Sequence, residues 1–555
     1  MIARLTALSH GVLLAEGWRR RGIAFGAGAV GALALAPIGF IPALAVSFTL
    51  AVWLLDGATG GPGRFSPRAL LMAAKDGWWF GFGYFLAGLW WIGAAFLVET
   101  DEFAWAMPLG VLGLPAGLGL FTALGFALAR LIWQIGTARI FALAFGLGAS
   151  EMLRHVVFTG FPWNTFGQGL GTSQLLAQSA ALVGTEGLGL LAIVMFATPA
   201  TLVDDRKGRP RFRPVVHATV LLAVMAAYGA VRLHFSGGVF AGPTDIESVP
   251  GIKLRLVQPN MSQREKIAQR DGMGVLNRLL ALSDRASGPT ATGMADATHV
   301  FWPESPFPFL ISHEPRATAE IAKMLPARTT LLTGAVRMEE AKGQPRRYYN
   351  SLLAFGAKGA IVGTYDKVHL VPFGEYLPLE RVLSAIGLRR FVHAPGAFST
   401  GEGRKPLDIP GLPPVLPLIC YEAIFPYEIM AEEARPGVIV NVTNDAWFGE
   451  TFGPHQHFQQ VRLRAIEFGL PVIRAANTGI SGVIDPYGRI VASIPVGVES
   501  IKDVFLPKAL TSTSYWSNGW WIGYIGLIFA FLLTYVSGWL GSWLDRRRLK
   551  RQAIP

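Results

Sequence analysis

The chain of 555 residues contains a single cysteine, Cys420, and few charged residues. One cysteine cannot form an intramolecular disulfide and cannot supply a thiolate zinc cluster, so the chain tolerates oxidising surroundings. Charged residues make up only 15% of the chain and hydrophobic residues 51%, with a mean hydropathy of +0.39. This composition is too apolar for an ordinary soluble protein and indicates a membrane protein with a soluble part.

The charge of the chain is strongly positive, with a net charge of +12 and an isoelectric point near 9.8. Such a balance fits either nucleic acid or anionic lipid as a partner. Because the arginines cluster beside long apolar segments, membrane topology and lipid explain the charge better. We therefore expect a bilayer and no nucleic acid around this protein.

Long apolar runs predict about eight membrane spans. The first run, residues 22–55, is longer than the apolar core of a cleaved signal peptide and can hold two spans hinged near Pro37. The other spans are expected at residues 77–98, 107–129, 140–157, 176–203, 214–233 and 519–540. An even number of spans places both termini on the same side of the membrane.

The loops between these spans differ in charge. Basic residues gather in alternate loops, at 19–21, 64–75, 130–139, 206–213 and 546–551. By the positive-inside rule this face is cytoplasmic, and the long insert before the last span then lies on the outer side of the membrane. The sequence thus predicts a helical bundle of about seven spans at 1–234, an extracytoplasmic domain at 235–515, and a final span with a basic tail at 516–555.

Two acidic side chains fall within predicted spans. Glu151 is spaced to pair with Arg154 along one helix face, and we expect a structural ion pair there rather than chemistry. Glu186 lies in another apolar span, and its sequence context gives no partner for it.

The insert alternates between strand-like and helix-like segments, which predicts an α/β sandwich of sheets covered by helices. Strands are expected at 252–257, 298–302, 330–336, 351–355, 415–419, 438–442, 472–475 and 482–485. Helices are expected at 265–283, 316–324 and 456–468. The Pro- and Gly-rich stretches 371–378 and 394–414 indicate long functional loops.

Cys420 follows an apolar strand and precedes a segment, 423–430, that reads as the first turns of a helix broken by Pro426. A thiol at such an elbow faces backbone N–H groups and the positive end of a helix dipole. Both favour a thiolate and stabilise an oxyanion. The alternative is that a lone cysteine serves as a small buried hydrophobic residue.

Two more reactive side chains stand near strand ends. Glu304 is flanked by prolines that fix its backbone, and Lys367 precedes a proline-rich loop. Each is a weak signal alone, since acidic residues at strand ends and solvated lysines are common. Together with Cys420 they form a set for acyl transfer. The carboxylate takes the thiol proton, the thiolate attacks a carbonyl, and the ammonium stabilises the oxyanion.

These side chains stand in motifs that resemble the nitrilase superfamily. The motifs are Trp302-Pro303-Glu304, Tyr365-Asp366-Lys367 and Cys420-Tyr421-Glu422. More narrowly, the chain resembles the apolipoprotein N-acyltransferase family, through the stretch 367–378, through Asn444-Asp445-Ala446-Trp447-Phe448-Gly449 and through its spans. The resemblance covers nearly the whole chain. It implies an αββα sandwich on a membrane α-helical bundle of about eight helices, in the bacterial inner membrane with the catalytic domain on the periplasmic side.

The same resemblance implies roles for individual residues. Matching positions make Glu304 the general base, Lys367 the oxyanion stabiliser and Cys420 the nucleophile. The matching supporting or substrate-facing positions are Glu375, Tyr376, Tyr421 and Glu422.

Among these supporting positions, Glu375 is expected near Lys367, orienting it or relaying protons, and the backbone N–H of Tyr421 is expected to face the oxyanion. The chain departs from the family at Ile267, which stands about where members carry a functional tryptophan. The departure bears on one substrate contact and leaves the acyl-transfer chemistry in place.

The reaction implied is a two-step transfer through a thioester on Cys420. The acyl chain comes from a membrane phospholipid and goes to the N-terminal amine of the diacylglyceryl-cysteine of an apolipoprotein. No cofactor or metal is implied, and we expect a monomer. Two alternatives stay open: a membrane-tethered nitrilase-type amidase with water as acceptor, and an inactive lipoprotein-binding protein. The intact Glu304, Lys367 and Cys420 argue against the second.

His455 and His457 are the remaining residues that could suggest a metal. The sequence offers no evident third ligand for them, so we expect a structural or loop role.

Overall fold

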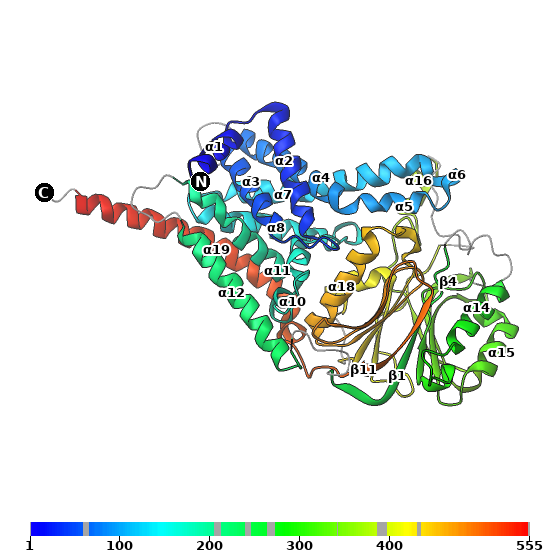
Figure 1. The fold of residues 1–555 in the computed structure, drawn as a ribbon. Coiled ribbons are helices and arrows are strands. Elements are labelled where there is room, and N and C mark those ends of the chain that lie inside the picture. The colour runs from blue at the N-terminus through cyan, green and yellow to red at the C-terminus, as the bar shows by residue number, and fades with distance from the viewer. Residues whose placement is uncertain are drawn as a thin grey trace. The chain divides into compact units, whose positions relative to one another are not determined.

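The computed structural model describes residues 2–58, 66–204, 212–238, 246–262, 272–340, 342–343, 345–385, 397–429 and 435–552. The chain forms two compact units, one of Met1–Val239 with Thr513–Pro555 and one of Phe240–Ser512. The first unit is helical, and the second is built on β-sheets (Figure 1).

The helical unit consists of helices of different lengths. The longer ones are α1 (Ile2–Leu13), α2 (Gly17–Gly31), α3 (Ala43–Gly57), α4 (Pro67–Leu89), α7 (Leu114–Leu131), α8 (Ala138–Arg154), α11 (Ala180–Phe196), α12 (Arg213–His234) and α19 (Ser514–Gln552). Short helices α5 (Gly93–Phe96), α6 (Thr100–Phe103), α9 (Phe166–Gly171) and α10 (Gln174–Ala177) lie between them. The helix break predicted near Pro37 is present, because α2 ends at Gly31 and α3 begins only at Ala43, and the two spans expected on either side stay predictions.

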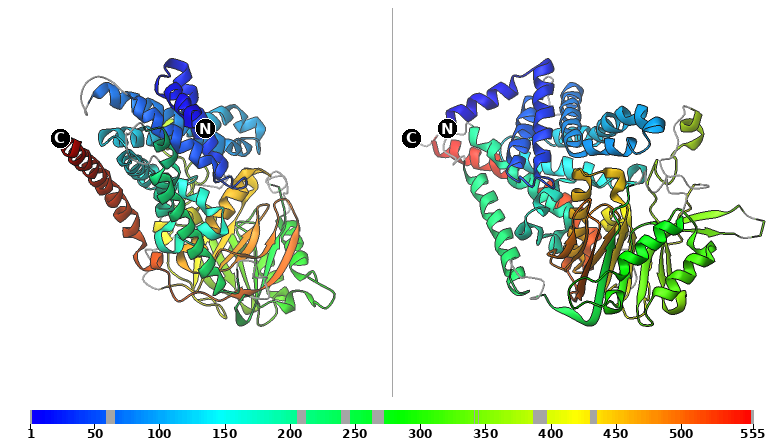
Figure 2. Two further views of the ribbon diagram at one scale, coloured as in Figure 1. Left: turned by 60° about the vertical axis from the view of Figure 1, so that its left-hand side comes forward. Right: turned by 45° about the vertical axis from the view of Figure 1, so that its right-hand side comes forward.

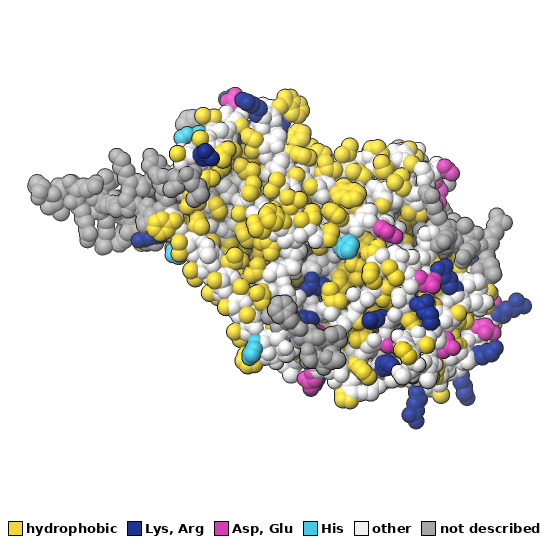
Figure 3. All heavy atoms as spheres, viewed as in Figure 1, with side chains coloured by type: hydrophobic (Ala, Val, Ile, Leu, Met, Phe, Trp, Pro, Cys, Tyr) yellow, Lys and Arg dark blue, Asp and Glu magenta, His cyan; other side chains and the backbone are white. Residues whose placement is uncertain are grey.

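Within the described residues, five helical segments are long and apolar enough to cross a membrane. They are Pro67–Phe96, Thr100–Leu131, Ala180–Val203, Arg213–His234 and Trp521–Trp539. They overlap five of the expected spans, and the total of eight stays a prediction. Large hydrophobic side chains such as Leu120, Val224 and Phe529 are exposed on these segments, and Figure 3 shows hydrophobic atoms gathered over this unit. Such a surface suits hydrocarbon better than water.

Charged side chains inside the helical unit are paired. Nη2 of Arg20 lies 2.6 Å from Oδ2 of Asp76, and both side chains are buried. Arg139 lies between Asp56 and Asp204, at 3.3 and 2.6 Å. Ions in a low-dielectric interior are costly unless paired. Two arginines of the predicted basic face therefore have carboxylate partners within the unit.

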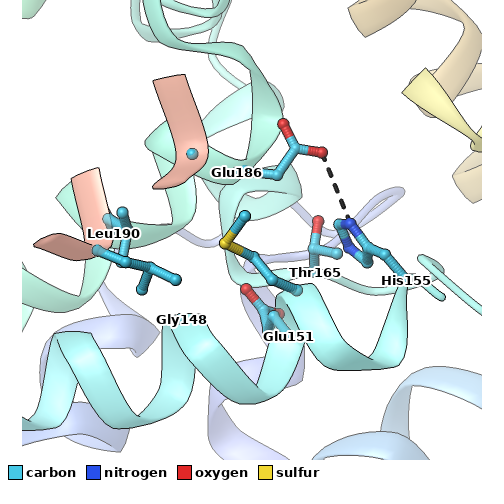
Figure 4. A pocket seen from close by; sticks show the side chains of 9 residues that line it. Gly148, Glu151, His155, Thr165, Glu186 and Leu190 are labelled. Atoms are coloured by element: carbon cyan, nitrogen blue, oxygen red, sulfur yellow. Dashed lines mark ion pairs between the residues drawn. The ribbon is translucent and has the colours of Figure 1, made fainter. Parts of the chain in front are cut away.

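The predicted pair on α8 is confirmed, with Nη2 of Arg154 3.4 Å from Oε1 of Glu151. Glu186 on α11 also has partners: the Tyr515 hydroxyl donates to it at 3.0 Å, and Nδ1 of His155 lies 3.8 Å away. Glu151, His155 and Glu186 line a small pocket (Figure 4). The Tyr515 hydrogen bond joins α19 to α11, which gives Glu186 the packing role that its sequence context did not reveal.

The second unit contains two mixed sheets. Its strands are β1 (Ser248–Gln258), β2 (His299–Phe301), β3 (Thr330–Glu339), β4 (Arg347–Phe355), β5 (Ile361–Asp366), β6 (Val415–Ile419), β7 (Val438–Thr443), β8 (Val472–Ala476), β9 (Ser481–Ile484), β10 (Ile490–Ile494) and β11 (Ser500–Pro507). The described strands form a six-stranded sheet, β11-β1-β2-β3-β4-β5, and a five-stranded sheet, β10-β9-β8-β7-β6. Strands β1 to β3 and β6 to β8 run parallel, and the other pairs are antiparallel.

Helices cover the outer faces of both sheets (Figure 2). Helices α14 (Gly272–Asp284) and α15 (Pro315–Met324) pack on the six-stranded sheet through one apolar core, and α18 (Phe452–Phe468) lies against the other sheet. A second core lies between the sheets, where Phe301 and Leu332 belong to the same cluster as Val440 and Ile473. The predicted αββα sandwich is confirmed.

Some local predictions for this unit were wrong. Strands β5, β10 and β11 were not predicted, because they are partly exposed edge or near-edge strands without a continuous apolar run. Cys420 is followed by a 3-10 turn, Cys420–Ile424, and by the four-residue helix α17 (Pro426–Ile429), so little helix dipole reaches the thiol. The helix expected from residue 265 is α14, and residues 263–271 lie outside the described part.

Candidate active site

Three strand ends in the second unit carry the predicted reactive side chains. Glu304 comes shortly after β2, Lys367 directly follows β5, and Cys420 directly follows β6. Strands β2 and β5 belong to one sheet and β6 to the other, so the side chains reach one place from both sheets. Nζ of Lys367 lies 3.7 Å from Oε1 of Glu304, and both charges act on the Cys420 thiol. The structure thus brings together the three residues that the sequence singled out.

Cys420 has a left-handed backbone conformation, with φ at +51°. A residue with a side chain rarely adopts this conformation, which costs about 1–3 kcal/mol unless the surroundings enforce it. The chain turns there from β6 into the 3-10 turn, and the cysteine is partly exposed while Tyr421 and Glu422 are buried. The strained elbow therefore presents the thiol to the site.

Glu304 is fixed by donors to both of its carboxylate oxygens. Nδ2 of Asn350 donates to Oε1 at 2.7 Å, and the backbone N–H of Asn444 donates to Oε2 at 2.9 Å. Behind it, Gly334 on β3 packs so closely that a Cβ atom there would lie 2.5 Å from Cα of Glu304. Only glycine allows this approach. The carboxylate is therefore held in one orientation beside the thiol.

The Lys367 side chain is buried between two carboxylates. Its Nζ lies 2.9 Å from Oε1 of Glu375, closer than to Glu304. Burial alone would lower the pKa of Lys367, but the charges of Glu375 and Glu304 outweigh it and raise that pKa above its ordinary value. The side chain is therefore a permanent ammonium, as an oxyanion stabiliser must be.

Glu375 joins the lysine to the loop that follows it. The same oxygen that faces Lys367 accepts from Nδ2 of Asn350 at 2.7 Å. The other oxygen accepts from the backbone N–H of Val371 at 2.7 Å. The structure thus places Glu375 beside Lys367, as expected, where it fixes both the ammonium and the start of the loop 371–378.

The Cys420 thiol carries its proton at rest. Burial raises the pKa of Cys420, the negative charge of Glu304 raises it further, and the positive charge of Lys367 opposes both. The net direction is upward, so the cysteine does not rest as a thiolate. A base next to it is needed to form the nucleophile, and Glu304 stands there.

Glu422 has a supporting rather than a reactive position. One carboxylate oxygen accepts from the backbone N–H groups of Val368 and His369, at 2.9 and 3.1 Å, and from Arg404 at 2.9 Å. The other accepts from the backbone N–H of Ile419 at 2.8 Å. Burial raises the pKa of Glu422, but Arg404, the Ile419 N–H and the charge of Lys367 outweigh it and lower that pKa. This buried carboxylate ties the segment after Lys367 to the strand before Cys420.

The two predicted tyrosines differ in burial. The Tyr421 ring is buried and packs edge-on against Phe425 and His369, with ring centroids 5.0 and 5.6 Å apart. Its backbone N–H comes directly after Cys420, where an oxyanion donor is expected. Tyr376 is half-buried next to Glu375. Ile267, the position of the family departure, lies outside the described residues.

The sequence did not single out several polar residues that complete the site. Asn350 bridges Glu304 and Glu375, Asn444 holds Glu304 through its backbone, and the Thr443 hydroxyl donates to Asp445. An amide or hydroxyl side chain gives no chemical signal of its own. The only available signal was the motif 444–449, which marked a segment without assigning a role.

His457 also lies at the site. Its Nε2 lies 3.2 Å from the backbone carbonyl oxygen of Cys420, and its ring is fully buried. His455 is exposed on the same helix. Among the described residues, no group of three or more His, Cys, Asp or Glu side chains could hold a metal ion. The role expected for His457 stays a prediction.

Comparison with known proteins gives matches over both units. The family model described as "Carbon-nitrogen hydrolase" matches residues 253–507, and that described as "Apolipoprotein N-acyltransferase N-terminal domain" matches residues 27–198. A solved amidase from Nesterenkonia sp. is 20% identical, with a TM-score of 0.34, over 47% of this chain and 92% of that one.

Relatives that match nearly end to end carry one name. The apolipoprotein N-acyltransferase of Rhodopseudomonas palustris is 48% identical over 92% of this chain and 94% of its own length. That of Bradyrhizobium diazoefficiens is 49% identical over 92% of this chain and 94% of its own. That of Agrobacterium fabrum is 47% identical, covering 90% and 92%.

Proposed function

The chain belongs to the apolipoprotein N-acyltransferase family, and from that membership we propose how its own residues carry out acyl transfer. It is an acyltransferase of lipoprotein maturation, with a lipoprotein as acceptor and a phospholipid as donor. The observation that supports the mechanism best is the buried ammonium of Lys367 between Glu304 and Glu375, beside the thiol of the half-buried residue Cys420. This arrangement supplies a base, a fixed cation and a nucleophile at one point.

In the first step Glu304 takes the proton of the Cys420 thiol as the sulfur attacks the carbonyl carbon of a phospholipid acyl ester. The carbonyl oxygen becomes an oxyanion, stabilised by the Lys367 ammonium and by the backbone N–H of Tyr421. The intermediate collapses to a thioester and expels the glycerol oxygen. Glu304 returns its proton to that oxygen, so a lysophospholipid leaves and the carboxylate is free again.

In the second step the N-terminal amine of the diacylglyceryl-cysteine attacks the thioester carbon. Glu304 accepts a proton from the attacking amine, and the same donors stabilise the second oxyanion. Collapse breaks the carbon–sulfur bond and leaves an amide on the lipoprotein. The proton on Glu304 passes to the sulfur, which restores the Cys420 thiol. The Glu304 carboxylate thus acts as both general base and general acid in each half of the ping-pong reaction.

The composition of the helical unit supports lipid substrates. Both substrates carry acyl chains, and the helical unit has segments apolar enough to lie in a bilayer. We place the protein in the bacterial inner membrane as a multi-pass chain. The basic loops then lie in the cytoplasm and the nitrilase-like domain lies on the periplasmic side. The loops 371–378 and 394–414 are candidates for gating lipid entry, and residues 394–396 lie outside the described part.

A membrane-tethered amidase with water as acceptor would use the same three side chains. The acceptor therefore has to be tested directly. Purified enzyme is incubated with phospholipid labelled in its acyl chain, the protein is analysed by mass spectrometry for a thioester, and a diacylated lipopeptide is then added. Cys420→Ala serves as the matched control, since it lacks the only thiol of the chain.

We expect an acyl adduct in the wild-type enzyme, none in Cys420→Ala, and transfer of the label to the peptide amine. Release of labelled fatty acid without amide product identifies a hydrolase. Absence of any adduct in the wild-type enzyme rules out both enzymes and leaves a binding protein.

A further inference from the structure

A second polar cluster lies behind Cys420, and the proposed steps do not use it. It centres on His457 of α18, whose Nδ1 lies 3.0 Å from Oδ1 of Asp445 and whose Nε2 lies 3.2 Å from the carbonyl oxygen of Cys420. Nη2 of Arg474 donates to Oδ2 of Asp445 at 2.7 Å. The Asp445 and His457 side chains are completely buried, as is that of Arg474. Burying these charged and polar side chains away from water costs free energy, so we expect the cluster to have a function at Cys420.

The proton positions in this cluster follow from its partners. The Cys420 carbonyl oxygen can only accept a hydrogen bond, so Nε2 of His457 must carry the hydrogen. Burial raises the pKa of Asp445, but Arg474 and His457 outweigh it and lower that pKa, so Asp445 is ionised. Burial and the charge of Arg474 lower the pKa of His457, with Asp445 opposing them. A neutral ring with its hydrogen on Nε2 still donates to Cys420, and its Nδ1 then accepts from Nη2 of Arg474, 3.1 Å away.

The cluster is anchored to the strands around the elbow. Arg474 on β8 also donates to Oδ1 of Asn441 on β7, and Nδ2 of Asn441 donates to the carbonyl oxygen of Leu418 on β6 at 3.0 Å. The Thr443 hydroxyl on β7 also donates to Oδ1 of Asp445 at 3.0 Å. The donor at Nε2 of His457 is therefore fixed relative to the sheet on which Cys420 stands.

The carbonyl that His457 holds belongs to the peptide unit between Cys420 and Tyr421. A trans peptide is planar, with its C=O and N–H pointing in opposite directions. Fixing the carbonyl oxygen therefore fixes the direction of the Tyr421 N–H. A hydrogen bond to the oxygen also polarises the unit and makes its N–H a stronger donor. In addition, the bond stabilises the left-handed conformation of Cys420, which is otherwise unfavourable.

We propose that His457, held by Asp445 and Arg474, is a positioning residue for the oxyanion site, acting through the Cys420–Tyr421 peptide unit. It aims and strengthens the N–H that meets the oxyanion, and it touches neither substrate nor the thiol. This inference rests on the proposed function, because it concerns the acylation of Cys420.

The test compares two reactions of the same thiol. Single-turnover acylation by labelled phospholipid needs the oxyanion site, whereas alkylation of Cys420 by iodoacetamide does not. The variants are His457→Met, which keeps most of the side-chain volume but removes the donor, and His457→Gln, which keeps an N–H donor. His455→Met on the exposed face of α18 is the matched control.

For His457→Met we expect an acylation rate about 100-fold lower, the loss seen when one oxyanion donor is removed. Alkylation should stay within about twofold of wild type, because thiol reactivity is set by other groups. His457→Gln should recover acylation to within about tenfold of wild type, as a neutral donor in the same place can. His455→Met should match the wild-type enzyme in both reactions.

Wild-type acylation by His457→Met overturns the proposal. An equal loss of acylation and alkylation also overturns it, since that pattern marks general damage to the elbow. If His457→Met does not fold, His457→Gln decides: a folded Gln variant that acylates supports the role, and a folded variant that does not acylate refutes it. Failure of the proposed function is distinguishable, because the wild-type enzyme itself then forms no thioester or passes no acyl group to the lipopeptide.

Discussion

Nζ of Lys367 lies 2.9 Å from a carboxylate oxygen of Glu375, in a place where both side chains are shielded from water. Glu304, the proposed base, is farther from the ammonium, at 3.7 Å. The two carboxylates therefore have different roles beside the Lys367 ammonium. Glu375 holds the charge of Lys367, which leaves Glu304 to exchange protons with the sulfur.

Replacing Glu375 by Gln should make Lys367 titrate within the range of an activity assay. Burial lowers the pKa of Lys367, and the neighbouring carboxylates hold it above its ordinary value. With one carboxylate removed, the pKa falls, and the fraction of charged lysine decreases as the pH rises. We expect acylation at pH 7 to drop by about 10- to 100-fold, with a further loss toward alkaline pH.

The measurement is the pH dependence of single-turnover acylation. The wild-type enzyme should show no alkaline loss that is attributable to Lys367, because its ammonium stays charged throughout. Glu380→Gln, at an exposed glutamate of the short helix α16 (Glu380–Ala385), is the matched control and should follow the wild-type profile. A Glu375→Gln enzyme with the wild-type profile contradicts the role of Glu375.

Replacing Glu304 by Gln should separate catalysis from thiol reactivity. The variant lacks the base, so we expect acylation by phospholipid to fall by about 10²- to 10⁴-fold. The same change removes a negative charge that raises the pKa of Cys420, while Lys367 continues to lower it. The thiol should therefore ionise at lower pH than in the wild-type enzyme.

The pH dependence of the rate of alkylation by iodoacetamide measures this change in the pKa of Cys420. Cys420 is the only cysteine, so the label reports a single site. We expect faster alkylation of Glu304→Gln than of wild type at neutral pH, together with slower acylation. An unchanged or higher alkylation midpoint is incompatible with Glu304 acting on the thiol.

The chemically active part of the site could be predicted because its signals are local. Trp302-Pro303-Glu304 and Cys420-Tyr421-Glu422 each place one reactive group next to an apolar strand, and the sandwich brings strand ends together. Strand β6 matches its expected bounds, since its five residues are all buried and apolar. A buried strand has no exposed face to obscure its pattern.

The supporting part could not be predicted, because it depends on contacts between distant segments. Asn350 lies 46 residues from Glu304 and 25 from Glu375, yet one amide nitrogen serves both carboxylates. The link from His457 to Cys420 spans 37 residues and two elements. The left-handed backbone conformation of Cys420 could not be predicted from the sequence either, because glycine is the residue that usually signals such a conformation.

Glu422→Gln should destabilise the protein. The carboxylate is completely buried and accepts from Arg404 and from backbone N–H groups on two segments. Removing its charge leaves Arg404 with a weaker partner in the interior, at a cost of about 3–5 kcal/mol. Thermal unfolding in detergent should show a lower Tm for Glu422→Gln. Glu402→Gln, at an exposed glutamate of the same loop as Arg404, should leave Tm unchanged.

The pH dependence of stability gives a second check on Glu422. Its pKa in the folded protein lies below the ordinary value of 4.5. The stability contributed by the carboxylate is therefore fully present above pH 4.5 and is lost as the pH falls through the lower folded value. The difference in Tm between wild type and Glu422→Gln should shrink over that acidic range. A constant difference argues against the ionised carboxylate as its source.

The Arg20–Asp76 ion pair should stabilise the helical unit. Asp76→Leu leaves the Arg20 guanidinium buried without its carboxylate, at a cost of about 3–5 kcal/mol, so Tm should fall clearly. Arg20→Met combined with Asp76→Leu removes both charges and should restore most of the loss. Arg19→Met, at the exposed neighbouring arginine, should leave Tm unchanged. If the double variant is as unstable as Asp76→Leu alone, the loss comes from packing and not from the unpaired charge.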